Sequence, residues 1–474
     1  MNSPRPSRIA LAERSSSLRP IKLAEQIADE ISRHIRSKGL TRRALLGNRT
    51  DLSREYGVSP AIMREAMRLL EDQGIAVARK GRGGGLVVVA STGDAPVDAL
   101  LSYMEFLEAT PEELHEVREE IAVVIQGAAA TCPDEREFET LMWLYDRASQ
   151  QLDSLLNFAE RFLDVSAQLA RMSRNPGLSL FHLTLERYLS ETIPIDQADA
   201  GATTLGIELG LANLQKTLAE VLSGNRSNAE AVARTIFRNS RLTTLGQNAA
   251  RPDERRLQRG FDRSALAADL AVSKGSMAAT LMRVILREIR ARGWPIGEKL
   301  GTEADYLARY GISRDVFRAA VRLLERHGAA EMRSGNGGGL IVCRPDPAVT
   351  IRAAVDFLTF SEFTAKQALD ARGALEPIAI RRLANTITAE TAVRLGNALS
   401  RTDRCRAVYD ILGSSLQMPL TSLFLQILWH SSVPLAHHRD EDASLTQMVE
   451  AIIARDPTKA ERLARRRLCS DQAH

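Results

Sequence analysis

GVSPAIMREAMRLLEDQGIAVARKGRGGGLVVV, from Gly57 to Val89, carries the pattern from which the expected architecture of the chain follows. A turn leads to Ser59, whose hydroxyl can accept from the free amides of a first helical turn. Pro60 follows at the first helical position, which tolerates proline's missing N–H. The basic helix that follows should end at Gly74 and bury Ile62, Ala66, Leu69 and Leu70. Two short apolar segments then flank a glycine cluster, which predicts a β-hairpin with glycines at its tip.

The same pattern returns 254 positions later (311 − 57 = 254), where Gly311 to Cys343 reads GISRDVFRAAVRLLERHGAAEMRSGNGGGLIVC. Between positions 47 and 90, 20 of 44 residues are identical to their partners at this offset. The repeat begins earlier, because one apolar face recurs: Leu23, Ile27, Ile31 and Ile35 in the first copy, and Met277, Leu281, Ile285 and Ile289 in the second. Short second helices are expected at 49–56 and 303–310. Helix, helix, turn, helix and hairpin is the order of a winged helix-turn-helix, so the sequence predicts two copies of it.

Composition sets limits on the class of protein. A chain of 474 residues with a net charge of +4 suits several domains, and so mild a charge does not by itself identify a nucleic-acid binder. The four cysteines lie far apart and form no CxxC pair, which argues against a disulfide framework or a thiolate zinc site. The sequence contains no apolar run of about 18 residues and no signal-peptide pattern. We therefore expect no membrane partner and a cytoplasmic, nucleoid-associated location.

The expected fold is mainly α-helical, with two winged helix-turn-helix domains that are each followed by an all-helical domain. Turn-forming Pro and Asp residues mark the exit from each wing, and the charged stretch before position 276 lacks clean periodicity at its start. The predicted segments are a flexible basic tail at 1–20, a first winged domain at 21–91, a helical domain at 92–250, a linker at 251–275, a second winged domain at 276–345 and a shorter helical domain at 346–474.

Arginines on the third helix of each copy are the main candidates for DNA contact. Arg64 and Arg68 are one turn apart, as are Arg318 and Arg322, and a recognition helix turns such a face towards the major groove. One such pair of arginines would more often form a solvated basic face. The pair occurs in both copies, each time after an N-cap and before a glycine-tipped hairpin, and this favours DNA contact. The predicted DNA-binding residues are Arg49, Ser59, Arg64, Arg68, Lys80, Arg82 and Gly84 in the first copy, and Ser313, Arg314, Arg318, Arg322, Arg333 and Gly338 in the second.

The glycine clusters have an alternative interpretation as nucleotide-phosphate loops. That arrangement requires a strand before the loop and a helix after it. Here the apolar run from Leu86 to Val89 follows the glycines and is typical of a strand. The pattern favours a hairpin tip whose backbone can approach DNA closely, with charge from Lys80 and Arg82 in the first copy.

The segments YGVSPAIMREAMRLLEDQG and YGISRDVFRAAVRLLERHG resemble the signature of the GntR superfamily of bacterial transcription regulators. The helical segment after each wing is similar to the FadR-type effector domain, called FCD. The resemblance implies a ligand-responsive regulator that is usually a dimer on a near-palindromic operator. Two positions depart from the family pattern: Pro60 stands where the family has the arginine kept at Arg314, and Arg49 replaces the acidic residue kept at Glu303. We therefore expect the halves to read different half-sites, or one half to bind mostly by charge.

Many FCD domains bind a metal through an Asp and three His, and the resemblance locates these positions in this chain. The first His position is Ser166 in the first half and Tyr409 in the second. The later ones fall near Gln215 and Ile236 or Phe237, and near Thr446 and Arg467. No imidazole stands at any of them, so we expect no metal and no cofactor. The adjacent His437 and His438 lie in a polar stretch that is typical of a surface loop.

Arg118 and Arg372 are the candidate effector-binding residues, since a guanidinium matches a carboxylate-like effector. A salt bridge to a nearby glutamate, such as Glu119 or Glu376, is the alternative for each. The chain offers no nucleophile–base constellation, so an enzyme is not expected. The predicted function is a DNA-binding transcription regulator, with repression as the expected mode. It would bind a double-stranded operator and a small-molecule effector as a fused, monomeric pseudodimer or as a homodimer; the alternative is a non-catalytic scaffold with degenerate DNA-binding modules.

Overall fold

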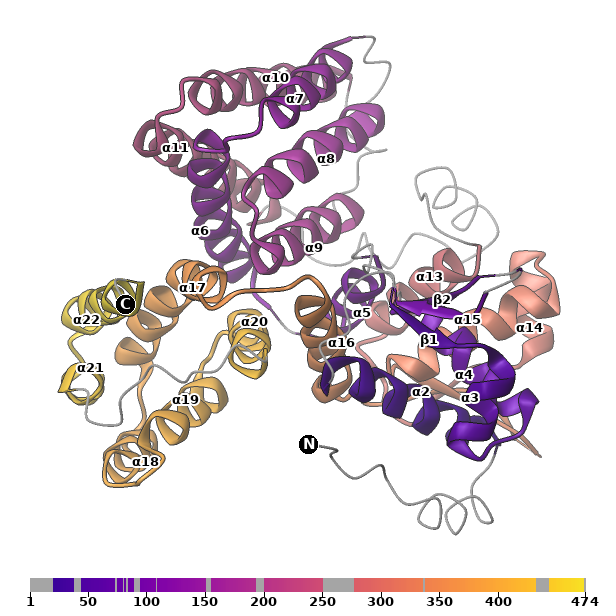
Figure 1. Cartoon of the computed structure of the whole chain (residues 1–474). Coiled ribbons are helices and arrows are strands. Elements are labelled where there is room, and N and C mark those ends of the chain that lie inside the picture. The colour runs from indigo at the N-terminus through magenta and orange to yellow at the C-terminus, as the bar shows by residue number, and fades with distance from the viewer. Residues whose placement is uncertain are drawn as a thin grey trace. The chain divides into compact units, whose positions relative to one another are not determined.

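The computed structural model describes residues 20–37, 44–72, 75–79, 81, 84–88, 94–107, 109–150, 155–192, 200–249, 277–335, 337–431 and 443–472 (Figure 1). The predicted tail up to residue 19, the predicted linker, Gly74, Lys80, Arg82, His437 and His438 lie outside the described residues. The chain forms two compact units, one made of residues 1–98 with 353–363 and the other of residues 99–352 with 364–474.

A first helix–sheet unit spans residues 20–88 and begins with α2 (Pro20–Ser37). It continues through β1 (Leu45–Gly47), α3 (Arg49–Tyr56), α4 (Pro60–Asp72), β2 (Ala76–Ala78) and β3 (Leu86–Val88). The Asn48 side chain caps α3 by accepting from the Asp51 amide, and Gly57, with φ of 65°, ends it. The strands form an antiparallel sheet in the order β1-β3-β2, so β1 is a third strand that the sequence did not predict.

The core of this unit lies between α2, α4 and the sheet. Its fully buried members include Ile27, Ile31, Met63 and Leu70. The prediction for α4 was wrong at Ile62 and Leu69, which are only partly buried, because the stripe that faces the core consists of Met63, Ala66, Met67 and Leu70. These positions follow the helical spacing of three and four residues, which leaves Ile62 and Leu69 at the edge of the stripe.

A second helix–sheet unit spans residues 277–342 and has the same order of elements. It comprises α13 (Met277–Ala291), β4 (Lys299–Gly301), α14 (Glu303–Tyr310), α15 (Arg314–Arg326), β5 (Ala330–Arg333) and β6 (Gly339–Val342). The sheet order is β4-β6-β5, and the pairing of Lys299 with Ile341 lies 254 positions after that of Leu45 with Val87. Met277 belongs to the predicted apolar face of this helix, but its side chain is 40% exposed at the first residue of α13.

The glycine clusters serve the packing of each sheet. A Cβ atom on Gly85 would lie 2.5 Å from the carbonyl oxygen of Gly47, and one on Gly339 would lie 2.5 Å from that of Gly301. Only glycine therefore allows the wing strand to pass so close to the first strand of its own sheet. The glycines were predicted to let the backbone approach DNA. At Gly85 and Gly339 they instead let it approach the protein's own backbone.

The helices that follow the two sheets pack in a crossed manner. α5 (Asp94–Met104) leads to Phe106, which packs against the core of the second helix–sheet unit and lies edge-on to Trp294, with ring centroids 5.2 Å apart. α16 (Pro347–Phe360) ends at Phe360, which packs against the core of the first helix–sheet unit. Phe106 and Phe360 are partners at the repeat offset, so each half supplies the same residue to the sheet unit of the other.

Two helical bundles complete the larger compact unit (Figure 1). The first bundle contains α6 (Pro111–Ala130), α7 (Glu135–Ser149), α8 (Leu155–Met172), α9 (Pro176–Thr192), α10 (Ala200–Leu222) and α11 (Arg226–Ala249). The second contains α17 (Ala365–Thr386), α18 (Ala389–Leu399), α19 (Arg404–Ser415), α20 (Pro419–His430), α21 (Ala443–Ile453) and α22 (Pro457–Gln472).

The two bundles meet through equivalent helices. Phe181 of α9 and Phe424 of α20 stack with ring centroids 4.1 Å apart and planes at 5°. Glu113, on the first turn of α6, accepts from the amide and hydroxyl of Thr421 at 2.8 and 3.0 Å. Gln367, at the same place on α17, accepts at its carbonyl oxygen from the Asn175 side chain at 2.8 Å. The contacts run in both directions, as expected at an approximate two-fold axis.

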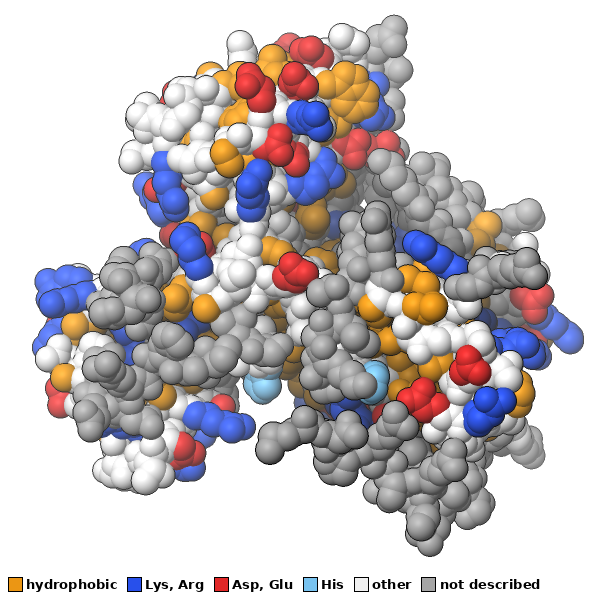
Figure 2. All heavy atoms as spheres, viewed as in Figure 1, with side chains coloured by type: hydrophobic (Ala, Val, Ile, Leu, Met, Phe, Trp, Pro, Cys, Tyr) orange, Lys and Arg blue, Asp and Glu red, His pale blue; other side chains and the backbone are white. Residues whose placement is uncertain are grey.

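Among the helices that the structure describes, none is both long enough and apolar enough to span a bilayer. Figure 2 shows acidic and basic side chains next to one another over α7 and α8, at the top of the view. This face of the first bundle therefore carries no one-signed charge field of the kind that attracts phosphate.

Candidate nucleic-acid interface and ligand cavity

The third helix of the first helix–sheet unit, α4, presents basic side chains beside a capped N-terminus. The Ser59 hydroxyl accepts from the Ile62 amide at 3.3 Å, and Pro60 opens the helix as predicted. Arg64 is exposed, whereas Arg68 is partly buried and forms an ion pair with Glu65 at 3.1 Å. Arg49 lies exposed at the first residue of α3. This surface can offer Arg49 and Arg64 to phosphates or base edges.

In the second helix–sheet unit the equivalent surface carries an acidic side chain. Ser313 caps α15 by accepting from the Val316 amide at 3.3 Å. Glu303 reaches two arginines at once, with its Oε1 3.4 Å from Nε of Arg314 and its Oε2 3.4 Å from Nε of Arg318. Arg322 is exposed one turn further along. The two units thus present different charge patterns at equivalent positions, because position 49 is Arg and position 303 is Glu.

Replacing Glu303 by Gln should tighten binding of the full chain to non-specific DNA about two- to five-fold at low salt. The carboxylate both repels phosphate and engages Arg314 and Arg318, so its removal leaves two exposed guanidinium groups. Fluorescence anisotropy against salt concentration measures the effect, which should vanish at high salt. Arg49→Glu is the matched control and should weaken the same binding. Equal affinities for all three proteins would exclude a role for this charge difference.

The wings place the remaining candidates near the hairpin tips. Arg333 is exposed and pairs with Glu331 at 2.7 Å. Gly338 is restricted to glycine, since a Cβ there would lie 2.4 Å from the Arg333 carbonyl oxygen, and Gly84 is partly buried. Arg79, the repeat partner of Arg333, is exposed just after β2, and its amide donates to the Gly85 carbonyl at 2.9 Å. Arg79 was not among the predicted DNA-binding residues, although its identity with Arg333 at the repeat offset could have revealed it.

His327 ends α15 and is buried, with Nδ1 lacking a hydrogen-bond partner. Burial lowers the pKa of its imidazole to about 3, and the charge on Arg326 acts in the same direction. In the unfolded chain this imidazole has a pKa of about 6.5, so below that pH it binds a proton there but stays neutral in the folded chain. The stability that neutral His327 provides is complete above about pH 6.5 and is lost as the pH falls towards 3.

We expect a drop from pH 7 to pH 5 to cost the second helix–sheet unit about 2 kcal/mol through this histidine. His327→Gln, which copies Gln73 at the repeat position, should remove that part of the pH dependence. Urea unfolding followed by Trp294 fluorescence, in a background with Trp143 and Trp429 replaced by phenylalanine, reports on this unit, because Trp294 lies in its core. If wild type and variant lost stability equally between pH 7 and 5, His327 would not be the group that titrates.

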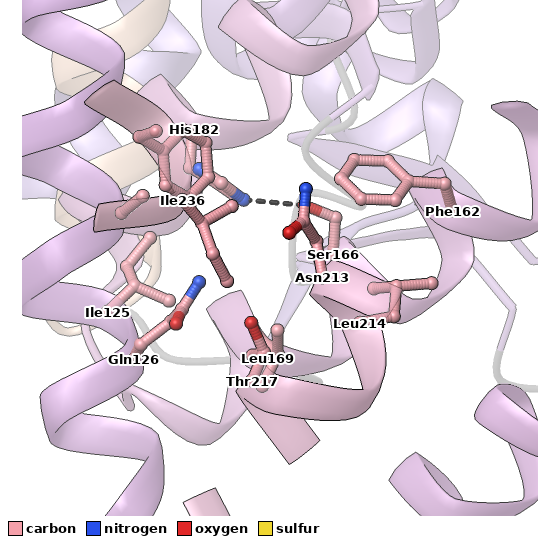
Figure 3. Close-up of a pocket in the computed structure, with 12 residues that line it drawn as sticks. Ile125, Gln126, Phe162, Ser166, Leu169, His182, Asn213, Leu214, Thr217 and Ile236 are labelled. Atoms are coloured by element: carbon pink, nitrogen blue, oxygen red, sulfur yellow. Dashed lines mark hydrogen bonds between the residues drawn. The ribbon is translucent and has the colours of Figure 1, made fainter. Parts of the chain in front are cut away.

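A cavity lies within the first bundle, where α6, α8, α9, α10 and α11 surround it (Figure 3). It offers about 40 Å³ to the centres of water molecules. Its polar lining consists of Gln126, Ser166, His182, Asn213 and Thr217, and the rest is apolar, including Phe162, Leu214 and Phe237. His182 Nε2 lies 2.7 Å from the Ser166 hydroxyl, and burial lowers the pKa of this imidazole. His182 is therefore neutral at pH 7.

The family-type metal site does not fit these residues. Ser166 occupies the first His position and lines the cavity, and Ile236 and Phe237 line it at a later one. A metal ion would find one imidazole, that of His182, among hydroxyl, amide and apolar groups, whereas such ions need three or four strong ligands. Within the described part of the chain, no group of three or more His, Cys, Asp or Glu side chains could hold a metal ion.

Arg118 does not reach this cavity with a free guanidinium. It donates to both oxygens of Glu186 at 2.6 and 2.7 Å and lies 4.7 Å from the ring centroid of Phe237. Burial alone would raise the pKa of Glu186, but the charge and hydrogen bonds of Arg118 outweigh it and lower the pKa. The ion-pair alternative therefore holds for Arg118, with Glu186 of α9 rather than the adjacent Glu119 as its partner.

The equivalent region of the second bundle is filled by side chains. Arg372 pairs with Glu376 at 2.8 Å, and Tyr409 bonds to both, accepting from Arg372 at 2.8 Å and donating to Glu376 at 2.9 Å. Arg467 is buried beside them and donates to the Cys405 sulfur at 3.3 Å. The cavity near this network offers only about 10 Å³. Arg372 thus forms the salt bridge with Glu376 that was the alternative to effector binding.

Three α-helices and a three-stranded antiparallel sheet, with a capped basic third helix, define the first helix–sheet unit as a winged helix-turn-helix. In sequence, residues 23–85 match the family described as "Bacterial regulatory proteins, gntR family". This segment is therefore a GntR-type helix-turn-helix domain, the DNA-binding domain of bacterial regulatory proteins.

The wider comparisons are as follows. No curated protein matches the chain. A solved structure described as "Streptococcus agalactiae GntR" is 15% identical, with a TM-score of 0.30, over 46% of this chain and 99% of its own. A second, described as "Lar controls the expression of the Listeria monocytogenes agr system and mediates virulence.", is 15% identical, with a TM-score of 0.20, over 46% of this chain and 95% of its own.

Proposed function

We propose that the chain is a sequence-specific DNA-binding transcription regulator of the FadR type, in which both helix–sheet units act as winged helix-turn-helix modules on one operator. The GntR-type domain at residues 23–85 is the observation that carries this proposal. The second module is supported by helices α14 and α15, whose bounds equal those of α3 and α4 at the repeat offset, and by the exposed Arg318 and Arg322. In this arrangement residues 21–91 and 276–345 are the DNA-binding domains, and 92–250 and 346–474 are FCD-like effector domains.

The chain acts as a pseudodimer within one polypeptide. Support comes from the equivalent contacts at the bundle interface, where Phe181 stacks on Phe424, and from the crossed packing of Phe106 and Phe360. Covalent linkage of two modules replaces a bimolecular association by an effective concentration of about millimolar. Because the modules differ at positions 49 and 303, one chain can read two unlike half-sites. Such a regulator works at the chromosome, in the cytoplasm.

A small-molecule effector controls DNA binding in this proposal. A carboxylate-like effector that used Arg118 or Arg372 would have to replace Glu186 or Glu376, since each arginine already forms a buried ion pair. Such a replacement is costly unless the ligand carboxylate restores every hydrogen bond. The cavity lined by Gln126 and His182 offers space without displacing an ion pair.

Gel shifts with DNA from the protein's own promoter region test the proposal, together with light scattering on the free and bound chain. We expect a complex of one chain per operator, with an affinity that falls steeply with salt. A dimer of chains at all working concentrations would contradict the pseudodimer, since such a dimer would bring four DNA-binding modules rather than two. Absence of salt-sensitive DNA binding would instead support a scaffold role for the helical bundles.

A further inference from the structure

Two residues that line the cavity of the first bundle each carry a buried polar atom without a hydrogen-bond partner. Gln126 Oε1 and His182 Nδ1 make no hydrogen bond, and their residues are 6% and 3% exposed. Figure 3 shows Gln126 and His182 among the residues that surround the open space. An unsatisfied buried polar group destabilises the fold, and two such groups around one cavity indicate that something else supplies their partners.

The chemistry of the lining restricts that molecule. His182 carries no charge at pH 7, and the nearest ions, Arg118 and Glu186, are bonded to each other through two hydrogen bonds. An ionic ligand would be buried without a counter-ion, at a cost of several kcal/mol. Gln126 Oε1 needs a donor, and Phe162, Leu214 and Phe237 offer apolar contact. The lining therefore suits a small uncharged molecule with an N–H or O–H group and an apolar body.

Helix α9 connects this cavity to the second helix–sheet unit. It carries His182 at the cavity and, less than two turns further along, Tyr188. The Tyr188 hydroxyl lies 2.5 Å from Nη1 of Arg290, which belongs to α13 of the second helix–sheet unit. The same nitrogen donates to Glu105 at 2.6 Å, and the Arg290 guanidinium lies 5.5 Å from the Tyr188 ring centroid. Helix α9 therefore contacts both the cavity and the unit that carries α15.

We propose that the cavity binds a small uncharged hydrogen-bond donor without a metal, and that helix α9 transmits its occupancy through Tyr188 and Arg290 to the second helix–sheet unit. This inference rests on the proposed effector control and specifies its ligand class and route. The route ends at α13 of the second helix–sheet unit, whereas the first helix–sheet unit belongs to the other compact unit. Regulation is thus one-sided: one ligand per chain acts on one of two DNA-binding modules.

Saturation-transfer NMR on the full chain tests the ligand class with propionamide, propionate and Zn²⁺. Propionamide and propionate have nearly the same shape and differ in charge. Propionamide should give transfer signals that fall at least three-fold in Gln126→Met, while propionate gives none and Zn²⁺ does not compete. Transfer to propionate, competition by Zn²⁺, an unchanged signal in Gln126→Met, or no signal with propionamide would each overturn the ligand class.

Hydrogen exchange of the full chain tests the route without using DNA. Propionamide should change amide exchange in peptides from 277–335 and leave those from 44–72 unaltered. Tyr188→Phe, which removes one oxygen, should abolish the change at 277–335 while propionamide still binds. An effect on 44–72, or one that survives in Tyr188→Phe, would overturn the route. Since gel shifts measure DNA binding separately, failure of the proposed function and failure of this inference are distinguishable.

Discussion

Replacing Arg318 and Arg322 together by alanine should lower the affinity of the full chain for its operator about 10²- to 10⁴-fold at physiological salt. That range is what a second linked module adds when both modules engage DNA at once. Both arginines are exposed on α15, and the Glu303 carboxylate contacts Arg318 only from 3.4 Å. If both arginines contact phosphates, the slope of log affinity against log salt concentration should become shallower by about 2. Anisotropy titrations at several salt concentrations give both quantities.

Two further variants control this experiment. Arg64→Ala with Arg68→Ala removes the repeat partners from α4 and should cost less, because Arg68 is partly buried whereas Arg318 and Arg322 are both exposed. Arg406→Ala removes an arginine that is 81% exposed on α19, outside both helix–sheet units, and should leave affinity unchanged. Unchanged operator binding in the α15 variant would remove the second helix–sheet unit from DNA recognition.

The repeat made the helix–sheet units predictable from sequence. Caps and glycines are local signals. Helices α3 and α14 therefore lie at the predicted 49–56 and 303–310, and each ends at a tyrosine that precedes a glycine. Burial within α4 was less predictable, since methionine and isoleucine are both apolar and only the position of α2 and the sheet selects Met63 and Met67. The third strands, β1 and β4, are three residues long and carry no alternation that a pattern could detect.

Contacts over long sequence distances were not predictable. Arg118 pairs with Glu186, 68 residues away, and nothing in the sequence distinguishes that glutamate from the adjacent Glu119. The crossed packing of Phe106 and Phe360 likewise depends on how the two halves assemble. Ser166, the first His position of the FCD pattern, does line the cavity. The same pattern also pointed to Tyr409 and Arg467 at the equivalent positions of the second half, but it could not indicate that Tyr409 bonds to both Arg372 and Glu376.

Replacing Glu376 by Ala should destabilise the second bundle by about 3–5 kcal/mol, because it leaves the Arg372 guanidinium buried without its counter-ion. The side chains of Arg372 and Glu376 are 4% and 1% exposed, so water cannot compensate. The Tyr409 hydroxyl loses its acceptor at the same time. Urea unfolding followed by Trp429 measures the effect when Trp143 and Trp294 are both replaced by phenylalanine, since the chain has three tryptophans.

The same helix offers a matched control, because Lys366 and Asp370 form an ion pair of the same spacing in which the Lys366 side chain is 80% exposed. Asp370→Asn should change stability by less than about 0.5 kcal/mol, since solvent screens such pairs. The double variant Arg372→Met with Glu376→Leu removes both charges and should recover most of the loss. A Glu376→Ala cost as small as that of Asp370→Asn would show that water or another cation reaches Arg372. A double variant as unstable as Glu376→Ala would instead assign the loss to packing around Tyr409.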